Sequence, residues 1–242
     1  MTAPPAISFD GSLRLGEAQV FFGVSFTLPA GAWSCVLGAS GVGKSSVLRL
    51  IAGLLPEGRF DGRITTSDGA PLDGRVALMA QSDLLMPWLD VRQNVTLGAR
   101  LRGTPVDVTR RDRLIDRVGL TAHAHKKPGA LSGGMRQRVA LARTLMEDTP
   151  VVLLDEPFSA LDARTRNEMQ DLAAQLLRGR TVLLVTHDPA EAARLGEHIL
   201  VMEASGATAV APAPGQGPHP VDAPATIAVQ MQLFDRLRGI PA

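Results

Sequence analysis

The chain has 242 residues with a formal net charge of +1, 45% hydrophobic residues and 4% aromatic residues. This length suits one large α/β domain or two small ones, and the near-neutral charge excludes the basic surface of a nucleic-acid-binding protein. The single cysteine, Cys35, excludes an intramolecular disulfide framework and a cysteine-based zinc site. The first ten residues lack the pattern of a secretory signal, and no apolar run is long enough to cross a bilayer, so we expect a cytosolic protein without membrane spans.

Hydrophobic periodicity predicts strands and helices that alternate along the chain. The expected strands span residues 20–28, 33–37, 151–154, 181–185 and 198–202. The expected helices span residues 45–54, 112–118, 132–146, 163–177 and 189–195, the first of them ending at Gly53 and Pro56. Alternate apolar residues of the first strand are expected to share one side: Val20, Phe22, Val24, Phe26 and Leu28. Strands that alternate with helices indicate a mostly parallel sheet covered by helices on both faces.

The last part of the chain changes in composition. Residues 206–224 are rich in Pro and Gly and predict a linker. After it, residues 227–237 predict an amphipathic helix whose apolar face would hold Ile227, Met231, Phe234 and Leu237. The histidines without metal-ligand spacing are expected at the surface: His123, His125, His198 and His219.

Residues 38–45 read Gly-Ala-Ser-Gly-Val-Gly-Lys-Ser and lie between an expected strand and an expected helix. They fit the pattern G-x-x-x-x-G-K-[S/T], in which backbone N–H groups and a helix N-terminus surround phosphates. Lys44 would neutralise phosphate charge, and the Ser45 hydroxyl would reach Mg²⁺. The alternative is an ordinary glycine-rich turn, which does not need Lys and Ser at these places. The expected nucleotide-binding residues are Gly38, Ala39, Ser40, Gly41, Val42, Gly43, Lys44, Ser45 and Ser46.

Polar side chains follow two of the expected buried strands. Asp155 and Glu156 come directly after residues 151–154, and His187 follows residues 181–185. Ligands of open α/β sheets bind at the carboxyl ends of the strands, so these side chains are expected to face the phosphate loop. There Asp155 suits Mg²⁺ coordination and Glu156 can polarise an attacking water. His187 can contact the γ-phosphate and hold that water. The alternatives are a solvated acidic turn and a structural histidine.

Residues 131–138, Leu-Ser-Gly-Gly-Met-Arg-Gln-Arg, resemble the signature motif of the ATP-binding-cassette (ABC) ATPases. Gln81 stands in the place of the family's Q-loop glutamine, residues 159–162 in the place of its D-loop, and His187 in the place of its switch histidine. With the phosphate loop and the acidic strand end, six motifs occur in the family's order.

The resemblance covers about residues 7–205 and implies an α/β fold with a P-loop NTPase core and a mostly parallel sheet. It also implies an antiparallel β subdomain and an inserted helical signature subdomain at about residues 84–148. Residues 1–205 would form the ABC ATPase domain. Residues 206–242 would form the linker and the C-terminal tail helix.

The resemblance further implies ATP and Mg²⁺ as cofactors and assigns a role to each motif. Glu156, His187 and Gln81 would be catalytic, and Ser45, Gln81 and Asp155 would hold the metal. In the family a second copy of the chain packs head to tail, and each signature closes on the other copy's ATP. The residues that would act in this way are Ser132, Gly133, Gly134, Met135 and Asp162.

Two positions depart from the family's pattern. Met135 stands where the signature usually has Gln, which removes a polar contact but keeps the serine and both glycines. Leu15 stands where an aromatic residue usually stacks on adenine, so the base would meet an aliphatic surface. These two differences could change the affinity for the nucleotide or the closure of the dimer.

The segment after Gln81 bears on the kind of transporter. Residues 84–88, Leu-Leu-Met-Pro-Trp, followed by Asn94 and Val95, resemble importers of nitrate, sulfonates, taurine and thiamine precursors, and the overall pattern is most similar to a hydroxymethylpyrimidine importer. The implied partners are transmembrane permease subunits and, indirectly, a substrate-binding protein, with this chain peripheral on the cytoplasmic face of the inner membrane. Trp88 would anchor the permease, unless it packs under the helical subdomain. The alternatives are the ATPase subunit of an ABC exporter and a soluble non-transport ABC ATPase.

Overall fold

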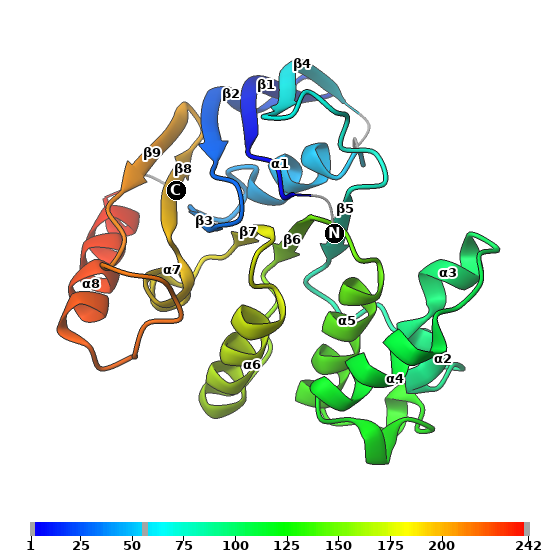
Figure 1. The fold of residues 1–242 in the computed structure, drawn as a ribbon. Helices are drawn as coiled ribbons and strands as arrows, with labels where there is room; N and C mark the ends of the chain where they lie inside the picture. The colour runs from blue at the N-terminus through cyan, green and yellow to red at the C-terminus, as the bar shows by residue number, and fades with distance from the viewer. Residues whose placement is uncertain (1–2, 55–57, 240–242) are drawn as a thin grey trace.

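The computed structural model describes residues 3–54 and 58–239 and is drawn in Figure 1. Pro56, at the expected end of the first helix, lies outside the described residues, as does the end of the tail segment at 240–242. Six strands form the central sheet in the order β5-β6-β7-β3-β8-β9. They are β3 (Trp33–Leu37), β5 (Val76–Met79), β6 (Val151–Asp155), β7 (Thr181–Val185), β8 (His198–Glu203) and β9 (Gly206–Val210). All neighbours are parallel except β8 and β9, which confirms the expected mostly parallel sheet.

Both faces of this sheet are covered, because its central strands are apolar throughout. Every residue of β3, β6 and β7 is buried, and a strand buried on both faces needs a cover on each. One hydrophobic core lies toward α1 (Lys44–Ile51) and a second sheet. The other lies toward α5 (Gly133–Met146), α6 (Ala163–Leu176) and α7 (Pro189–Leu195) (Figure 1). In the part of the chain that the structure describes, no helix combines the length and the apolarity needed to span a membrane.

The second sheet is antiparallel and holds three strands in the order β2-β1-β4. They are β1 (Ile7–Leu15), β2 (Ala18–Leu28) and β4 (Arg59–Thr66). The expected alternation along β2 is wrong at one place, since Phe21 is buried and Phe22 is 66% exposed. The pairing slips here, because Leu13 of β1 faces Phe21 whereas Gly11 faces Val24. A bulge of this kind turns side chains to the opposite face and depends on the partner strand.

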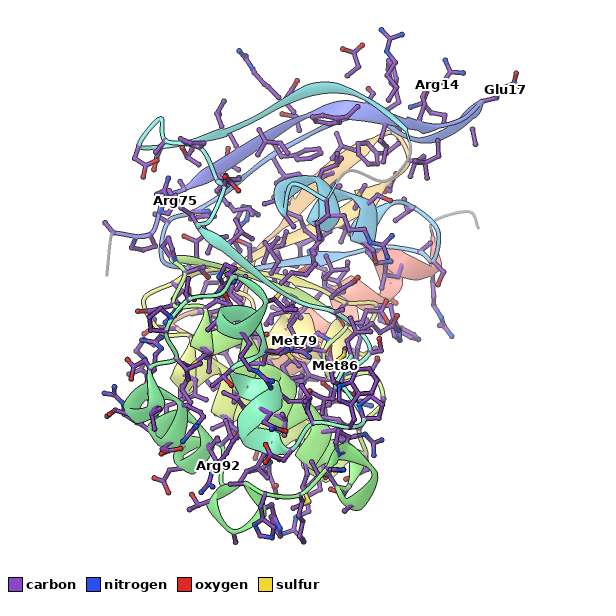
Figure 2. The ribbon with its side chains drawn as sticks, turned by 90° about the vertical axis from the view of Figure 1, so that its right-hand side faces the viewer. Arg14, Glu17, Arg75, Met79, Met86 and Arg92 are labelled. Atoms are coloured by element: carbon purple, nitrogen blue, oxygen red, sulfur yellow. The ribbon has the colours of Figure 1, made fainter. Side chains whose placement is uncertain are left out.

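The helical segment follows β5 and precedes β6 in the chain and lies to one side of the sheet (Figure 1). Its elements are α2 (Val91–Val95), α3 (Leu97–Leu101), α4 (Val108–Arg117), two 3-10 turns (Thr121–His123 and Pro128–Ala130) and α5. In Figure 2, Arg92 of α2 lies at one end of the molecule, Arg14 and Glu17 of the β1–β2 hairpin lie at the other, and Met79 lies between them. The helical segment and the antiparallel sheet therefore extend in opposite directions from the central sheet.

Buried Asn94 organises the turn that leads into α2. Its side chain accepts a hydrogen bond from the Met86 N–H at 2.8 Å and donates to the carbonyl oxygens of Met86, Leu89 and Asp90. These bonds fix the turn that carries Trp88, which is 65% exposed. The alternative in which Trp88 packs under the helices is therefore wrong.

The C-terminal part of the chain differs from its expected organisation. Residues 206–210 belong to β9 and extend the sheet antiparallel to β8, so they are not part of a linker. Helix α8 (Pro224–Arg238) packs against α7 through side chains spaced three or four residues apart: Thr226, Val229 and Leu233. Most of the expected apolar face lies at the surface instead: Ile227, Met231 and Phe234. The helix has apolar residues on two sides, and only the position of α7 decides which side is buried.

The linker between β9 and α8 is docked on α7. The backbone N–H of His219 donates to the carbonyl oxygen of Arg194 at 2.8 Å, and the side chain of His219 is buried. The expected surface position of His219 is therefore wrong. The composition of a linker does not show which of its residues contact the domain.

We expect Leu233→Ala to destabilise the chain and Met231→Ala, its control on the same helix, to leave it nearly unchanged. Leu233 is fully buried, so its truncation removes buried methyl groups and leaves a cavity, at a cost of about 2–5 kcal/mol, whereas Met231 is 53% exposed. Urea denaturation followed by circular dichroism measures the difference. Equal losses, or a larger loss for Met231→Ala, would contradict the observed orientation of α8.

Candidate functional site

The phosphate loop joins the end of β3 to the start of α1. Gly38 lies so close to β8 that a Cβ there would come within 2.4 Å of the carbonyl oxygen of Met202. Gly43 caps α1 with a φ of 99°, in the left-handed region that favours glycine. These two glycines fix where the loop begins and ends. They place its backbone at the N-terminus of α1, where free N–H groups and the helix dipole favour an anion.

Lys44 holds the loop together from inside. Its Nζ donates to the carbonyl oxygens of Gly38 and Ala39, each at 2.8 Å. Burial lowers the pKa of Lys44, and the carboxylates of Glu156 and Asp155 act against this shift. The ammonium group therefore lies inside the loop, where a bound phosphate would need positive charge.

Ser45 and Asp155 join the first turn of α1 to the end of β6. The Ser45 Oγ donates to Oδ1 of Asp155 at 2.9 Å. Burial raises the pKa of Asp155, although the hydrogen bond from Ser45 lowers it. A hydroxyl beside a carboxylate, with the side chain of Gln81 lining the same cavity as Ser45, is the kind of oxygen donor set that Mg²⁺ prefers. The side chains present therefore fit a Mg²⁺ ion.

Glu156 brings together the three residues predicted to be catalytic. Its Oε2 accepts a hydrogen bond from Nε2 of Gln81 at 3.1 Å and lies 3.0 Å from Nδ1 of His187. Glu156 has a φ of 45°, which is a strained conformation for a residue with a side chain. Its backbone N–H donates to the carbonyl oxygen of Val185 at the end of β7. This hydrogen bond ties the strained turn to the neighbouring strand.

One cavity of about 560 Å³ contains these groups. Gln81, Glu156 and His187 line it together with most of the predicted loop residues, which are Ser40, Gly41, Gly43, Lys44, Ser45 and Ser46. Gly38 and Ala39 bind Lys44 instead, and Val42 packs toward the core. Leu15, at the predicted adenine position, also lines the cavity, together with Val20. Val20 was not among the predicted site residues; it belongs to β2, far from the loop in the chain, and its Cγ1 would lie 2.9 Å from a Cβ at Gly43.

The signature residues lie around a second cavity, of about 680 Å³. Ser132 caps α5, its Oγ accepting from the Met135 N–H at 3.3 Å. Asp162 caps α6, and backbone hydrogen bonds lower the pKa of its carboxyl. The predicted residues that line this cavity are Ser132, Gly133, Gly134, Met135 and Asp162. No described residue lines both cavities, so one chain does not bring its signature to its own phosphate loop.

Two arginines of α5 hold the segment that follows Gln81, and sequence analysis missed them. Arg136 pairs through Nε with Oδ2 of Asp83 at 3.0 Å. Arg143 donates to the carbonyl oxygens of Asp83 and Leu84, at 2.6 and 2.8 Å. The two arginines are seven residues apart and hence on one face of the helix. This spacing, together with an acidic residue just after Gln81, is the signal that could have found them.

Comparison with known proteins places the chain in a family. A family model described as "ABC transporter" matches residues 21–159. An uncharacterised ABC transporter ATP-binding protein of Haemophilus influenzae is 42% identical over 237 residues, covering 95% of this chain and 97% of its own length. An aliphatic sulfonates import ATP-binding protein of Agrobacterium fabrum is 46% identical over 200 residues, with 81% and 72% covered. A taurine import ATP-binding protein of Roseobacter denitrificans is 41% identical over 204 residues, with 83% and 73% covered. The chain therefore belongs to the ABC transporter family, as one of its ATPase subunits.

Proposed function

We propose that this chain hydrolyses ATP with Glu156 as the general base and thereby powers an importer for an organic sulfonate, either an aliphatic sulfonate or taurine. One observation carries the hydrolytic part: Oε2 of Glu156 lies within hydrogen-bond distance of both Gln81 and His187, in the cavity of the phosphate loop. The solute class is supported by the relatives, whose names state aliphatic sulfonates and taurine.

ATP binding begins at the phosphate loop. The ammonium group of Lys44 would exchange its two carbonyl partners for phosphate oxygens, and N–H groups at the N-terminus of α1 would add hydrogen bonds. Leu15 offers adenine an aliphatic surface in place of an aromatic ring. A bound Mg²⁺, held by Ser45, Asp155 and Gln81, would supply positive charge against the phosphates.

The hydrolytic step needs a water in line with the γ-phosphate and a group that takes its proton. Gln81 donates a hydrogen bond to Oε2 of Glu156, and Nδ1 of His187 lies 3.0 Å from the same oxygen, so the carboxyl group is held in place in the cavity. When a neutral His187 donates from Nδ1, its Nε2 can accept a hydrogen bond from the water, and in the imidazolium form Nε2 would instead donate to the γ-phosphate. Glu156 would therefore act as the base, while Gln81 and His187 orient it.

Hydrolysis is proposed to need a second copy of this chain, packed head to tail. The 14-residue helix α5 begins after Ser132, and a helix N-terminus binds anions. Gly133 leaves room there, because a Cβ at this position would have no neighbour closer than 3.9 Å. The signature and the phosphate loop line separate cavities of one chain, so a two-fold dimer would complete two ATP sites at once.

The permease contact is proposed at the exposed turn that carries Leu84 and Trp88. Both side chains face solvent, and Arg143 holds the backbone of Leu84 in place. A large exposed aromatic residue on a fixed turn is a suitable anchor for a partner protein. The chain would then be a peripheral subunit on the cytoplasmic face of the inner membrane and would reach a substrate-binding protein only through the permease.

Other functions are less well supported. An exporter subunit would share this fold, but the relatives whose names state a direction are import proteins. A soluble ABC ATPase that works on nucleic acid would need a basic surface, which a net charge of +1 does not favour. A thiamine precursor as the solute rests on the short segment between Arg75 and Gln81 and on the overall sequence pattern, so it ranks below the sulfonates, which the names of relatives state.

Glu156→Gln should abolish hydrolysis and trap an ATP-bound dimer. The amide has the shape of the carboxylate but cannot take a proton from water, so phosphate release should fall by about 10²-fold or more. ATP should stay bound, and the closed interface should persist. Sedimentation velocity should therefore show a shift from monomer to dimer with Mg-ATP and none without nucleotide.

Asp222→Asn is the matched control for this variant, because it removes the same charge from an exposed turn before α8. It should hydrolyse ATP like the wild type. A Glu156→Gln chain that still hydrolyses ATP would contradict the role of Glu156. One that binds ATP but stays monomeric would contradict a dimer held by ATP.

The two signature glycines provide a second test. Gly133→Ala adds its methyl group in open space, so thermal stability should stay unchanged while kcat falls at least about tenfold, because the partner's phosphates could not approach. Gly134→Ala places its methyl group 2.7 Å from Cγ2 of Thr165 and should cost about 1–3 kcal/mol of unfolding free energy. Differential scanning fluorimetry and phosphate release measure both effects. A fully active Gly133→Ala chain would rule out phosphate binding by this signature.

The solute class is tested in the organism that encodes the chain. Deletion of the gene should prevent growth on taurine or an alkanesulfonate as the sole sulfur source and leave growth on sulfate unchanged. The wild-type gene should restore growth, and the Glu156→Gln gene should not. A growth defect cured by hydroxymethylpyrimidine would instead assign a thiamine precursor.

A further inference from the structure

Arg166, on the first turn of α6, faces three groups in two segments around the site: the loop that ends in Asp162 and the start of α7. Its Nη2 donates to the carbonyl oxygen of Leu161 at 3.0 Å, just before the cap residue Asp162. Its Nη1 donates to Oδ2 of Asp188 at 3.4 Å, directly after His187. Its Nε lies 3.8 Å from Oε1 of Glu191 on α7. One guanidinium group therefore lies between the loop that ends in Asp162 and the loop that carries His187.

Glu191 connects Arg166 to the strand end that precedes His187. It is 3% exposed, and its Oε2 accepts a hydrogen bond from Oγ1 of Thr186 at 2.7 Å. The same Thr186 Oγ1 accepts from the Asp188 N–H at 3.1 Å. Of the two neighbours of His187 in the chain, Thr186 is thus bound to Glu191, which Arg166 faces, and Asp188 is bound by Arg166 itself. Because Nδ1 of His187 lies 3.0 Å from Glu156, any rotation of this loop changes the contact with the proposed base.

We propose that Arg166 is a positioning residue that couples the loop ending in Asp162 to the loop carrying His187, so that the histidine faces Glu156 only when the first loop is in place. This inference rests on the proposed function, since it assumes that His187 serves hydrolysis and that Asp162 lies at the interface with a second copy. Arrival of that copy would then be transmitted to the histidine through the planar guanidinium group, which donates hydrogen bonds to Leu161 and Asp188 in two fixed directions and faces Glu191 with its Nε.

The competing explanation is that Arg166 only fastens α6 to α7, and the chain provides a matched control for it. Arg194, on α7, also bridges these two helices, donating to Oε1 of Gln170 at 2.8 Å and to Oδ1 of Asp171 at 2.6 Å. It is 8% exposed and contacts neither loop. A residue that acts only on helix packing should behave like Arg194.

The test compares full-length Arg166→Met, Arg194→Met, His187→Ala and the double variant Arg166→Met with His187→Ala. Steady-state phosphate release gives kcat and KM, an ATP titration gives Kd, and thermal unfolding gives stability. Arg166→Met should lower kcat about tenfold and change KM and Kd less than about twofold, because the phosphate loop is untouched. Arg194→Met should lose at least as much stability yet keep kcat within about twofold of the wild type. In the His187→Ala background, Arg166→Met should add less than about twofold, since it acts through the histidine.

Arg166→Lys keeps a positive charge if Arg166→Met does not fold. It should remain several-fold slower than the wild type, at about a third of its kcat or less, because an ammonium group lacks the planar fork that bonds Leu161 and Asp188 from two separate nitrogen atoms. Equal kcat losses in Arg166→Met and Arg194→Met, additive losses in the double variant, or a folded Arg166→Lys as fast as the wild type would each overturn the coupling while leaving the proposed function intact. A His187→Ala chain as fast as the wild type would overturn the proposed role of the histidine and this inference with it.

Discussion

The parallel pairing of β3, β6 and β7 is the constraint on which the whole site depends. Val185 of β7 lies opposite Val36 of β3 on one side and opposite Asp155 of β6 on the other, so the three strands end at one level. The phosphate loop, Glu156 and His187 follow these ends within a few residues. Backbone hydrogen bonds of the sheet therefore bring them together, and the loops at that edge need only short turns to complete the cavity.

Features that depend on residues close together in the chain could be predicted from the sequence. Features that depend on a partner far away in the chain could not. The phosphate loop could be predicted because its glycines, lysine and serine act within eight consecutive residues. The parallel strands that end in polar residues could also be predicted, because a strand buried on both faces is a continuous apolar run in the sequence. The outward turn of Phe22 depends on a slip against β1, and the buried face of α8 depends on α7. In both cases an element that is distant in the chain decides which side chains are buried, and local hydrophobic periodicity holds no information on that element.

In the site, too, the groups within motifs could be predicted, whereas the contacts with distant elements could not. Motif spacing predicted that Glu156 and His187 meet near the loop, but the contacts that support them come from other elements. Gln81 is 75 residues from Glu156 in the chain, and α5 holds the segment after Gln81 through Arg136 and Arg143. Arg143 lies outside every motif, and the role expected for the signature does not include the contact between Arg136 and Asp83. A movement of α5 relative to the sheet would therefore displace the amide that binds Glu156, although no residue of α5 lines the phosphate cavity.

The two hydrogen bonds of Lys44 determine what nucleotide binding has to achieve. The ammonium group already satisfies the carbonyl oxygens of Gly38 and Ala39, so the loop acquires its shape during folding and is preorganised before any ligand arrives. An incoming phosphate would have to replace these carbonyl oxygens as the lysine's partners, and the two carbonyl groups would need other donors. A polyphosphate offers more negative charge for this exchange than a small monoanion does, so the same two bonds would favour a polyphosphate as the ligand.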